Sequence, residues 1–141
     1  MKKILFIIIS LISFSVQAVT AASDEDKYHF DNLEEVRSFI NWQVNGWQVI
    51  DSRSLIVNMS ASESYLLILD RDLRALKFTE SIRISSTNSR VRSNIDQVHV
   101  LDQFARPSRI KTIYRLPNRE ARQNARAKIL AEEIVISGEA I

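Results

Sequence analysis

The chain has 141 residues, of which 45% are hydrophobic and 26% charged. This composition is typical of a globular protein, and the length is that of one domain and not of two. It contains two glycines, two histidines and no cysteine. The missing thiols exclude a cysteine nucleophile and a thiolate zinc site, and the scarcity of glycine excludes phosphate-binding loops and the glycine-flanked serine of a hydrolase elbow. We therefore expect no cofactor and no metal site.

Residues 1–21 have the layout of a secretory signal peptide. Residues 1–3 supply positive charge, residues 4–16 form an apolar run broken only by serine, and small residues follow at Ala18 and Ala21. These 13 apolar-dominated positions would span about 20 Å as a helix, which is short of a hydrocarbon core of roughly 30 Å. We expect export to the periplasm or beyond, with no transmembrane segment in the mature chain. A lipid anchor at the junction would need a cysteine, so none is expected.

The mature chain divides into a leader, one domain and a tail. We expect residues 22–30 to form a disordered acidic leader and residues 31–131 to form a single β-rich domain. Residues 132–141 form a C-terminal tail, in which residues 134–136 fit either a last strand or an extension of the preceding helix. Without cysteines the domain must take its stability from its core, and about 120 residues are enough for that.

Two helices are predicted, one at each end of the domain. The first lies near residues 32–40, because Asp31 and Glu34 have the spacing of a capping box and three apolar residues fall on one helical face: Leu33, Val36 and Ile40. The second covers residues 119–131. It follows the N-cap residue Asn118 and carries apolar residues every four positions: Ala121, Ala125 and Ile129.

Between the helices, six short apolar or alternating runs predict strands separated by turn-rich breaks. The runs are residues 47–50, 55–59, 65–69, 81–85, 97–101 and 109–114. A shorter edge piece is predicted at residues 90–92, and one helical turn or an irregular crossing at residues 70–76. This pattern predicts a mainly β (α+β) fold: a small antiparallel barrel or sandwich of about six strands with a short N-terminal helix and a C-terminal helix.

The strand motifs occur in a recognisable order: Gly46-Trp47-x-x-Ile50-Asp51, Leu55-Ile56-Val57, Tyr65-Leu66-Leu67-x-Leu69, Leu76-x-Phe78, Asp96-x-Val98-x-Val100 and Ile110-x-x-Ile113-Tyr114-x-Leu116. This ordered set spans residues 38–117 and resembles a domain-of-unknown-function family of small exported proteobacterial proteins. The resemblance implies a periplasmic setting and no known activity. Members usually carry cysteines at three positions that we match here to Ser38, Leu73 and Ser108, so the resemblance implies a variant without the family's thiols.

Charge is distributed unevenly along the mature chain. Residues 23–72 hold ten acidic and four basic side chains, whereas residues 73–128 hold four acidic and thirteen basic ones. A two-residue period places Arg109, Lys111 and Arg115 on one strand face. The basic side chains that could contact an anion or an acidic partner are Arg90, Arg92, Arg109, Lys111 and Arg115.

The alternative for these basic side chains is that they pair with the acidic half of the same domain. Without residues 1–21 the chain has 17 basic and 17 acidic side chains and is formally neutral. Because a dedicated nucleic-acid binder normally carries net positive charge, nucleic acid is not the favoured partner.

Trp42 is a candidate exposed aromatic contact, because polar residues flank it outside any clear periodicity. Trp47 lies within a strand pattern and is expected in the core. We interpret the chain as a non-enzymatic binding or interaction module of the cell envelope, whose partner is an envelope protein or a polyanion. The alternative is a hydrolase-like enzyme, which would need at least two of three side chains within about 6–9 Å in a pocket: Asp51, Asp96 and His99.

Overall fold

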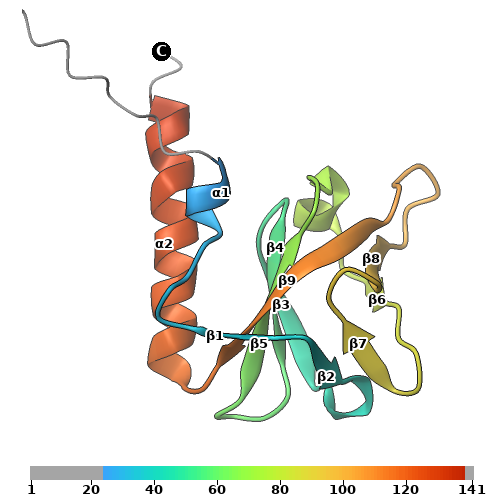
Figure 1. Cartoon of the computed structure of the whole chain (residues 1–141). Helices are drawn as coiled ribbons and strands as arrows, with labels where there is room; N and C mark the ends of the chain where they lie inside the picture. The colour runs from blue at the N-terminus through green and yellow to red at the C-terminus, as the bar shows by residue number, and fades with distance from the viewer. Residues whose placement is uncertain (1–23, 139–141) are drawn as a thin grey trace, which may run out of the picture.

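The computed structural model describes residues 24–138. The predicted signal peptide, residues 1–21, lies outside the described residues, as do residues 139–141. Figure 1 shows a curled antiparallel sheet, a second small sheet and a C-terminal helix standing beside the main sheet. The predicted mainly β fold class is therefore confirmed, with a half-barrel as the form that the main sheet takes. No helix among residues 24–138 is long and apolar enough to cross a membrane.

Six antiparallel strands follow one another across the main sheet. Their spatial order is β3 (Gly46–Asp51), β4 (Ser54–Asn58), β5 (Ser64–Leu69), β9 (Ser108–Leu116), β8 (Gln97–Val100) and β6 (Ile82–Ile84). β9 is central, because β5 lies along one side of it while β8 and β1 (Glu34–Val36) share the other side.

The continuous apolar runs of β4 and β5 arise because both faces of these strands are buried. Leu67 and Leu69 face the inner core, which lies inside the curl of the sheet and also contains Phe39, Val91 and Ile113. Leu66 and Ile68 face the outer core, which lies between the sheet and the C-terminal helix. Alternate residues of one strand therefore serve two different cores.

The C-terminal helix α2 (Arg119–Gly138) covers the outer core. The side chain of Asn118 caps it, since its Oδ1 accepts a hydrogen bond of 2.8 Å from the backbone N–H of Ala121. Ala125 and Ile129 are buried against the sheet, as the four-residue spacing predicts. The helix continues beyond residue 131. Residues 134–136 therefore extend it, which is one of the two alternatives that the sequence leaves open, and residues 132–138 form neither a separate tail nor a last strand.

The small second sheet closes the open side of the inner core. It pairs β2 (Ser38–Ile40) with β7 (Arg90–Arg92), and the paired residues Phe39 and Val91 both point into that core. The ring of Phe39 also stacks on Tyr65, with ring centroids 5.0 Å apart. Two short 3-10 helices complete the domain: η1 (Asn41–Gln43) and η2 (Arg74–Phe78).

The predicted helix at residues 32–40 is wrong, because this segment forms β1 and β2. Val36 pairs with Ile113 of β9, and Phe39 pairs with Val91 of β7. The apolar spacing that fits one helical face also fits two short strands, and the hydrogen bonds offered by β9 and β7 decide between them.

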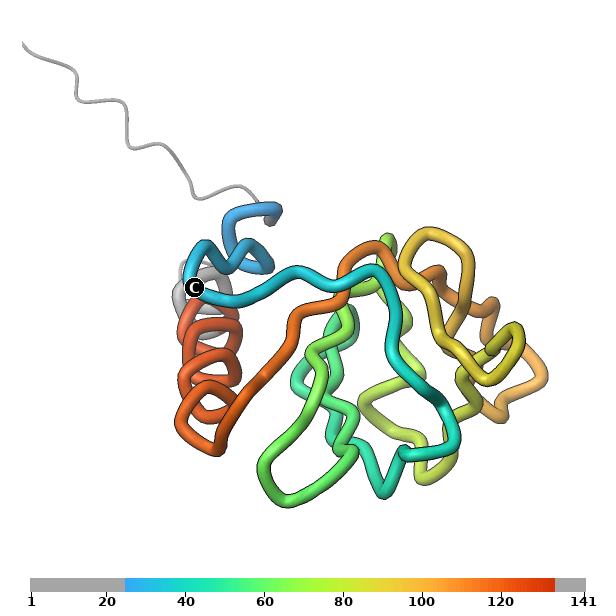
Figure 2. The backbone as a smooth tube through the Cα atoms, turned by 60° about the horizontal axis from the view of Figure 1, so that its bottom comes forward, coloured from blue at the N-terminus to red at the C-terminus, as the bar shows by residue number. Residues whose placement is uncertain are grey.

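The segment that precedes β1 is folded in the structure. It begins with a four-residue helix, α1 (Asp24–Lys27), and both Lys27 and Phe30 are buried. The ring of Phe30 meets Tyr114 of β9 edge-on at a centroid distance of 5.4 Å. Figure 2 shows this segment running from beside α2 across to the sheet. The prediction of a disordered leader is therefore wrong for residues 24–30.

Candidate binding surfaces

A bulge interrupts β9 in the middle of the predicted basic face. Ile68 of β5 pairs with Thr112, but the next residue, Leu69, pairs with Ile110. Lys111 is therefore the extra residue of a β-bulge. An extra residue in one strand moves every later side chain to the other face of the sheet.

The bulge places the basic residues of β9 on both faces of the sheet. Ile110 and Ile113 both belong to the inner core although they are three residues apart, which shows where the alternation changes. Arg109 therefore lies on the outer side before the bulge, and Arg115 lies on the inner side after it. The prediction that Arg109, Lys111 and Arg115 share one face is wrong.

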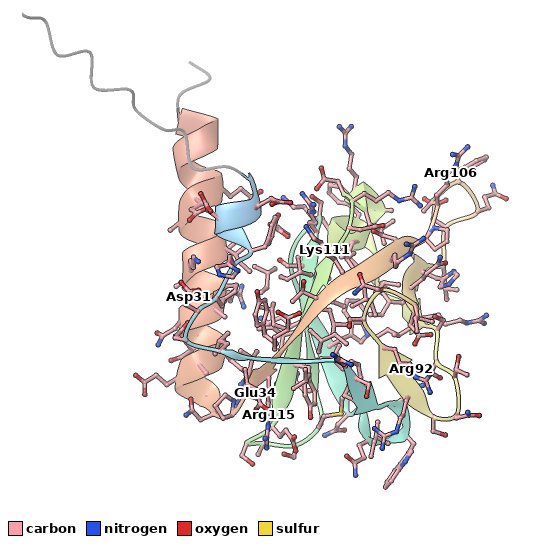
Figure 3. The ribbon with its side chains drawn as sticks, viewed as in Figure 1. Asp31, Glu34, Arg92, Arg106, Lys111 and Arg115 are labelled. Atoms are coloured by element: carbon pink, nitrogen blue, oxygen red, sulfur yellow. The ribbon has the colours of Figure 1, made fainter. Side chains whose placement is uncertain are left out.

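Two of the five predicted basic residues pair with carboxylates of the acidic N-terminal half. Lys111 Nζ lies 3.1 Å from a carboxylate oxygen of Glu25. Arg115 lies between two carboxylates, 3.8 Å from Glu34 and 3.6 Å from Glu63, and Figure 3 shows it beside Glu34 at one end of β9. Internal pairing, the alternative considered from the sequence, thus applies to these two residues. Partly exposed pairs of this kind contribute at most about 1 kcal/mol each.

The other three predicted basic residues occupy different elements. Arg90 and Arg92 lie on β7 of the small sheet, and Arg109 lies near the start of β9. Within the part of the chain that the structure describes, none of the three lies within ion-pair distance of a carboxylate. The guanidinium group of Arg90 donates a long hydrogen bond of 3.5 Å from Nη1 to the hydroxyl of Ser38.

Trp42 lies in η1 and its side chain is 72% exposed. Trp47 is half-buried on the edge strand β3 and belongs to neither core, which differs from the prediction. Trp47 is less buried than predicted because β3 is an edge strand, with a neighbouring strand on one side alone.

The structure does not bring together the three residues of the alternative hydrolase site. Asp51 ends β3, whereas Asp96 precedes β8, and three strands separate β3 from β8 in the sheet. The two oxygens of Asp96 accept hydrogen bonds from Ser85 Oγ and from the backbone N–H of Arg92, each of 2.7 Å. His99 lies within β8. Among residues 24–138, no group of three or more histidine and carboxylate side chains is arranged to hold a metal ion.

Asp51 acts as the anchor of the N-terminal segment. Its carboxylate accepts hydrogen bonds from Tyr28 Oη (2.8 Å), Ser54 Oγ (2.7 Å) and the backbone N–H of Arg53 (2.9 Å), and it lies 2.9 Å from Lys27 Nζ. Burial by itself raises the pKa of Asp51, but these hydrogen bonds outweigh burial and hold the pKa below its ordinary 3.8. The carboxylate is therefore ionised at neutral pH and fully engaged in joining α1 to the β3–β4 turn.

The sequence analysis missed an exposed apolar surface at the end of the sheet where η2 and the β8–β9 loop meet. Phe78 is 87% exposed, Phe104 85% and Leu101 69%. Two shallow hollows, of about 480 and 420 Å³, lie beside these side chains and share Ala75 and Asp102 in their walls. We name Phe78, Leu101 and Phe104 the apolar patch.

Arginines border the apolar patch. Arg71, Arg74 and Arg106 line the same hollow as Phe104. Arg71 is held by the carbonyl of Pro107, while Arg74 and Arg106 have no carboxylate within ion-pair distance among residues 24–138. Figure 3 shows Arg106 extending away from the sheet on the β8–β9 loop.

The comparison with family models gives one match, to a family of unknown function (DUF6491) over residues 1–132. The chain belongs to this family. Neither the curated proteins nor the solved structures contain a match. The DUF6491 match extends beyond residues 38–117, on which the resemblance was based. It includes both η2 and the β8–β9 loop, so the apolar patch is part of the family domain.

Proposed function

We propose that the protein is an exported, non-enzymatic binding module of the cell envelope that holds an acidic, apolar segment of a partner protein on the apolar patch. The observation that carries this proposal is the exposure of three large apolar side chains at one end of the domain. Large apolar side chains that are exposed close together on a protein surface mark interaction sites. Each aromatic side chain that a partner buries contributes roughly 1.5–3 kcal/mol.

The elements that carry Phe78 and Leu101 are anchored in the inner core. Within η2, Leu76 is buried in the inner core, and just before it the backbone N–H of Leu73 donates a hydrogen bond of 2.7 Å to the carbonyl of Ser52. Val100, which precedes Leu101, is also buried in that core. The elements that carry Phe78 and Leu101 are thus fixed by their own core residues, and a partner would meet a surface that needs little ordering.

The arginines beside the apolar patch favour an acidic partner. Arg74 and Arg106 lie beside Phe104 without carboxylate partners among residues 24–138. Two carboxylates share that hollow, and both already accept hydrogen bonds: Asp102 from the backbone N–H of Phe104 (3.0 Å) and Asp72 from Ser52 Oγ (3.1 Å). A partner segment with carboxylates next to its apolar side chains would pair with the two arginines while its apolar side chains cover the patch.

The same proposal includes export and the absence of catalysis. The layout of residues 1–21 supports export. The hydrogen bonds that occupy both oxygens of Asp96 and the carboxylate of Asp51 support structural roles for these residues in place of acid-base roles. Fractionation followed by N-terminal sequencing tests export: we expect a mature chain that begins near residue 19, 22 or 23, and an intact Met1 in the membrane fraction would contradict it.

A peptide selection tests the binding surface. We would select displayed peptides on the wild-type domain and compare their affinities for F78S/F104S, for R74Q/R106Q and for W42S. Trp42 is the matched control, because it is an exposed aromatic residue on another element. We expect the selected peptides to combine acidic and apolar residues, to lose about tenfold or more in affinity with either double variant, and to be unaffected by W42S. Peptides that bind F78S/F104S as well as the wild type would contradict the proposal.

A further inference from the structure

A second surface, which shares no lining residue with the apolar patch, lies where α2 crosses the β3–β4 hairpin. The two elements enclose a groove of about 290 Å³ whose floor is the buried side chain of Ile56. Its polar lining consists of Gln48, Asn58, Arg119, Arg122, Gln123 and Arg126. No carboxylate is part of this lining. We name this surface the arginine groove.

Three positively charged arginines lie on one side of α2, within two turns of the helix. Arg119, Arg122 and Arg126 are spaced by three and four residues, so they project from one side of the helix. None of them lies within ion-pair distance of a carboxylate in the described part of the chain. Like charges at this spacing oppose helix formation, and an anion between them would remove that repulsion.

A chain of hydrogen bonds fixes the groove before any ligand arrives. Arg122 donates from Nη1 to Ser64 Oγ (3.0 Å) and from Nη2 to the carbonyl of Ala61 (3.1 Å). The hydroxyl of Ser64 is buried and donates in turn to Asn58 Oδ1 (2.9 Å). This bond directs Oδ1 of Asn58 toward Ser64 and leaves its amide N–H groups as donors for the groove. Arg122 and Asn58 are therefore oriented by the fold itself.

We propose that the arginine groove binds a phosphate group. Phosphate carries about two negative charges and several acceptor oxygens, which match three guanidinium groups and the amide donors beside them. The phosphate could belong to a small ester or to the headgroup of an anionic phospholipid, because both present the same chemistry to the groove. The groove shares no lining residue with the apolar patch, so this inference does not depend on the proposed function.

The test measures binding of two probes to the domain: glycerol 3-phosphate in solution, and phosphatidylglycerol vesicles compared with phosphatidylcholine vesicles. The variant is R119Q/R126Q, with R126Q alone as a second variant that changes a single exposed helix residue. The matched control is R37Q/R83Q, which removes the same charge from two exposed positions outside the groove. Melting temperatures measured without probe show whether each variant is folded.

We expect the wild type to bind at least one probe and R119Q/R126Q to bind it about tenfold or more weakly, because each lost arginine removes a charge-assisted hydrogen bond. The control should stay within about twofold of the wild type, since its charges lie outside the groove. Binding of glycerol 3-phosphate identifies a small phosphate ester, and binding of phosphatidylglycerol vesicles alone identifies a lipid headgroup. The inference fails if the wild type binds neither probe, or if R37Q/R83Q weakens binding as much as R119Q/R126Q.

Discussion

The ammonium group of Lys27 lies 2.9 Å from the carboxylate of Asp51, and the two residues are 8% and 2% exposed. This buried pair joins α1 to the turn between β3 and β4, two segments far apart in the sequence. Tyr28, next to Lys27, donates its hydroxyl to the same carboxylate. One aspartate therefore holds two consecutive residues of the N-terminal segment.

Replacing Asp51 by alanine should destabilise the domain strongly. The change leaves the charge of Lys27 buried without its partner and removes the acceptor of Ser54 and Tyr28, so we expect a loss of about 3–5 kcal/mol in the free energy of unfolding. Urea unfolding measures it. Asp72→Ala is the matched control, because Asp72 is exposed and we expect a loss of at most about 1 kcal/mol there. Equal losses in the two variants would refute the anchoring role of Asp51.

Asp51 should also affect how the free energy of unfolding changes at acid pH. Its pKa in the folded state lies below 3.8, so its ionised form is favoured by folding. This contribution is complete above the unfolded pKa of about 3.9 and is lost as the pH falls through the folded pKa. We expect the free energy of unfolding to decline below about pH 4 more steeply in the wild type than in Asp51→Asn. Parallel declines in the two proteins would count against this assignment.

Tyr28 makes the corresponding prediction on the alkaline side. Burial, together with the hydrogen bond to Asp51, raises the pKa of Tyr28 well above its ordinary 10.0. Its contribution is present below pH 10 and is lost as the pH rises above the unfolded pKa toward the folded one. Thermal melts should be recorded between pH 9 and pH 11, a range that brackets the ordinary tyrosine pKa of about 10. Over this range the melting temperature should decline less for Tyr28→Phe than for the wild type. An unchanged slope would show that another group causes the decline.

The packing of α2 should depend on Ile129. This side chain is fully buried between the helix and the sheet. Ile129→Ala leaves a cavity in the outer core, and we expect it to cost about 2–5 kcal/mol in urea unfolding. Asn124→Ala at an exposed position of the same helix is the control, with an expected loss of at most about 0.5 kcal/mol. A small effect of Ile129→Ala would mean that α2 is not docked through this residue.

The sequence predicts elements well where local pattern and burial agree. Residues 65–69 form a strand because both faces are covered, and residues 119–131 form a helix because an N-cap and a regular apolar stripe coincide. Residues 32–40 show the limit of this reasoning. Their apolar spacing suits a helix, but their actual partners are β9 and β7, which lie far along the chain and leave no local signal.

The candidate surfaces depend mostly on features that the pattern of residues does not contain. The bulge at Lys111 reverses the face of Arg115, and its one mark in the sequence is the three-residue spacing of Ile110 and Ile113, which a strict two-residue period overlooks. Phe78 and Phe104 are large apolar residues that a sequence alone places in the core, and their exposure follows from how η2 and the β8–β9 loop leave the sheet. The arginine groove needs α2 and the β3–β4 hairpin to meet.

The most direct test of the proposed binding function is site-specific photo-crosslinking in intact cells. A photoreactive phenylalanine analogue would replace Phe104, with Trp42 as the control position, because both side chains are exposed and lie on different elements. We predict a crosslinked product at position 104 and none at position 42. Mass spectrometry should place the crosslink in an acidic, apolar segment of an envelope protein, and R74Q/R106Q should abolish it. No product at position 104, equal products at both positions, or a crosslink to a second copy of this chain would contradict the account.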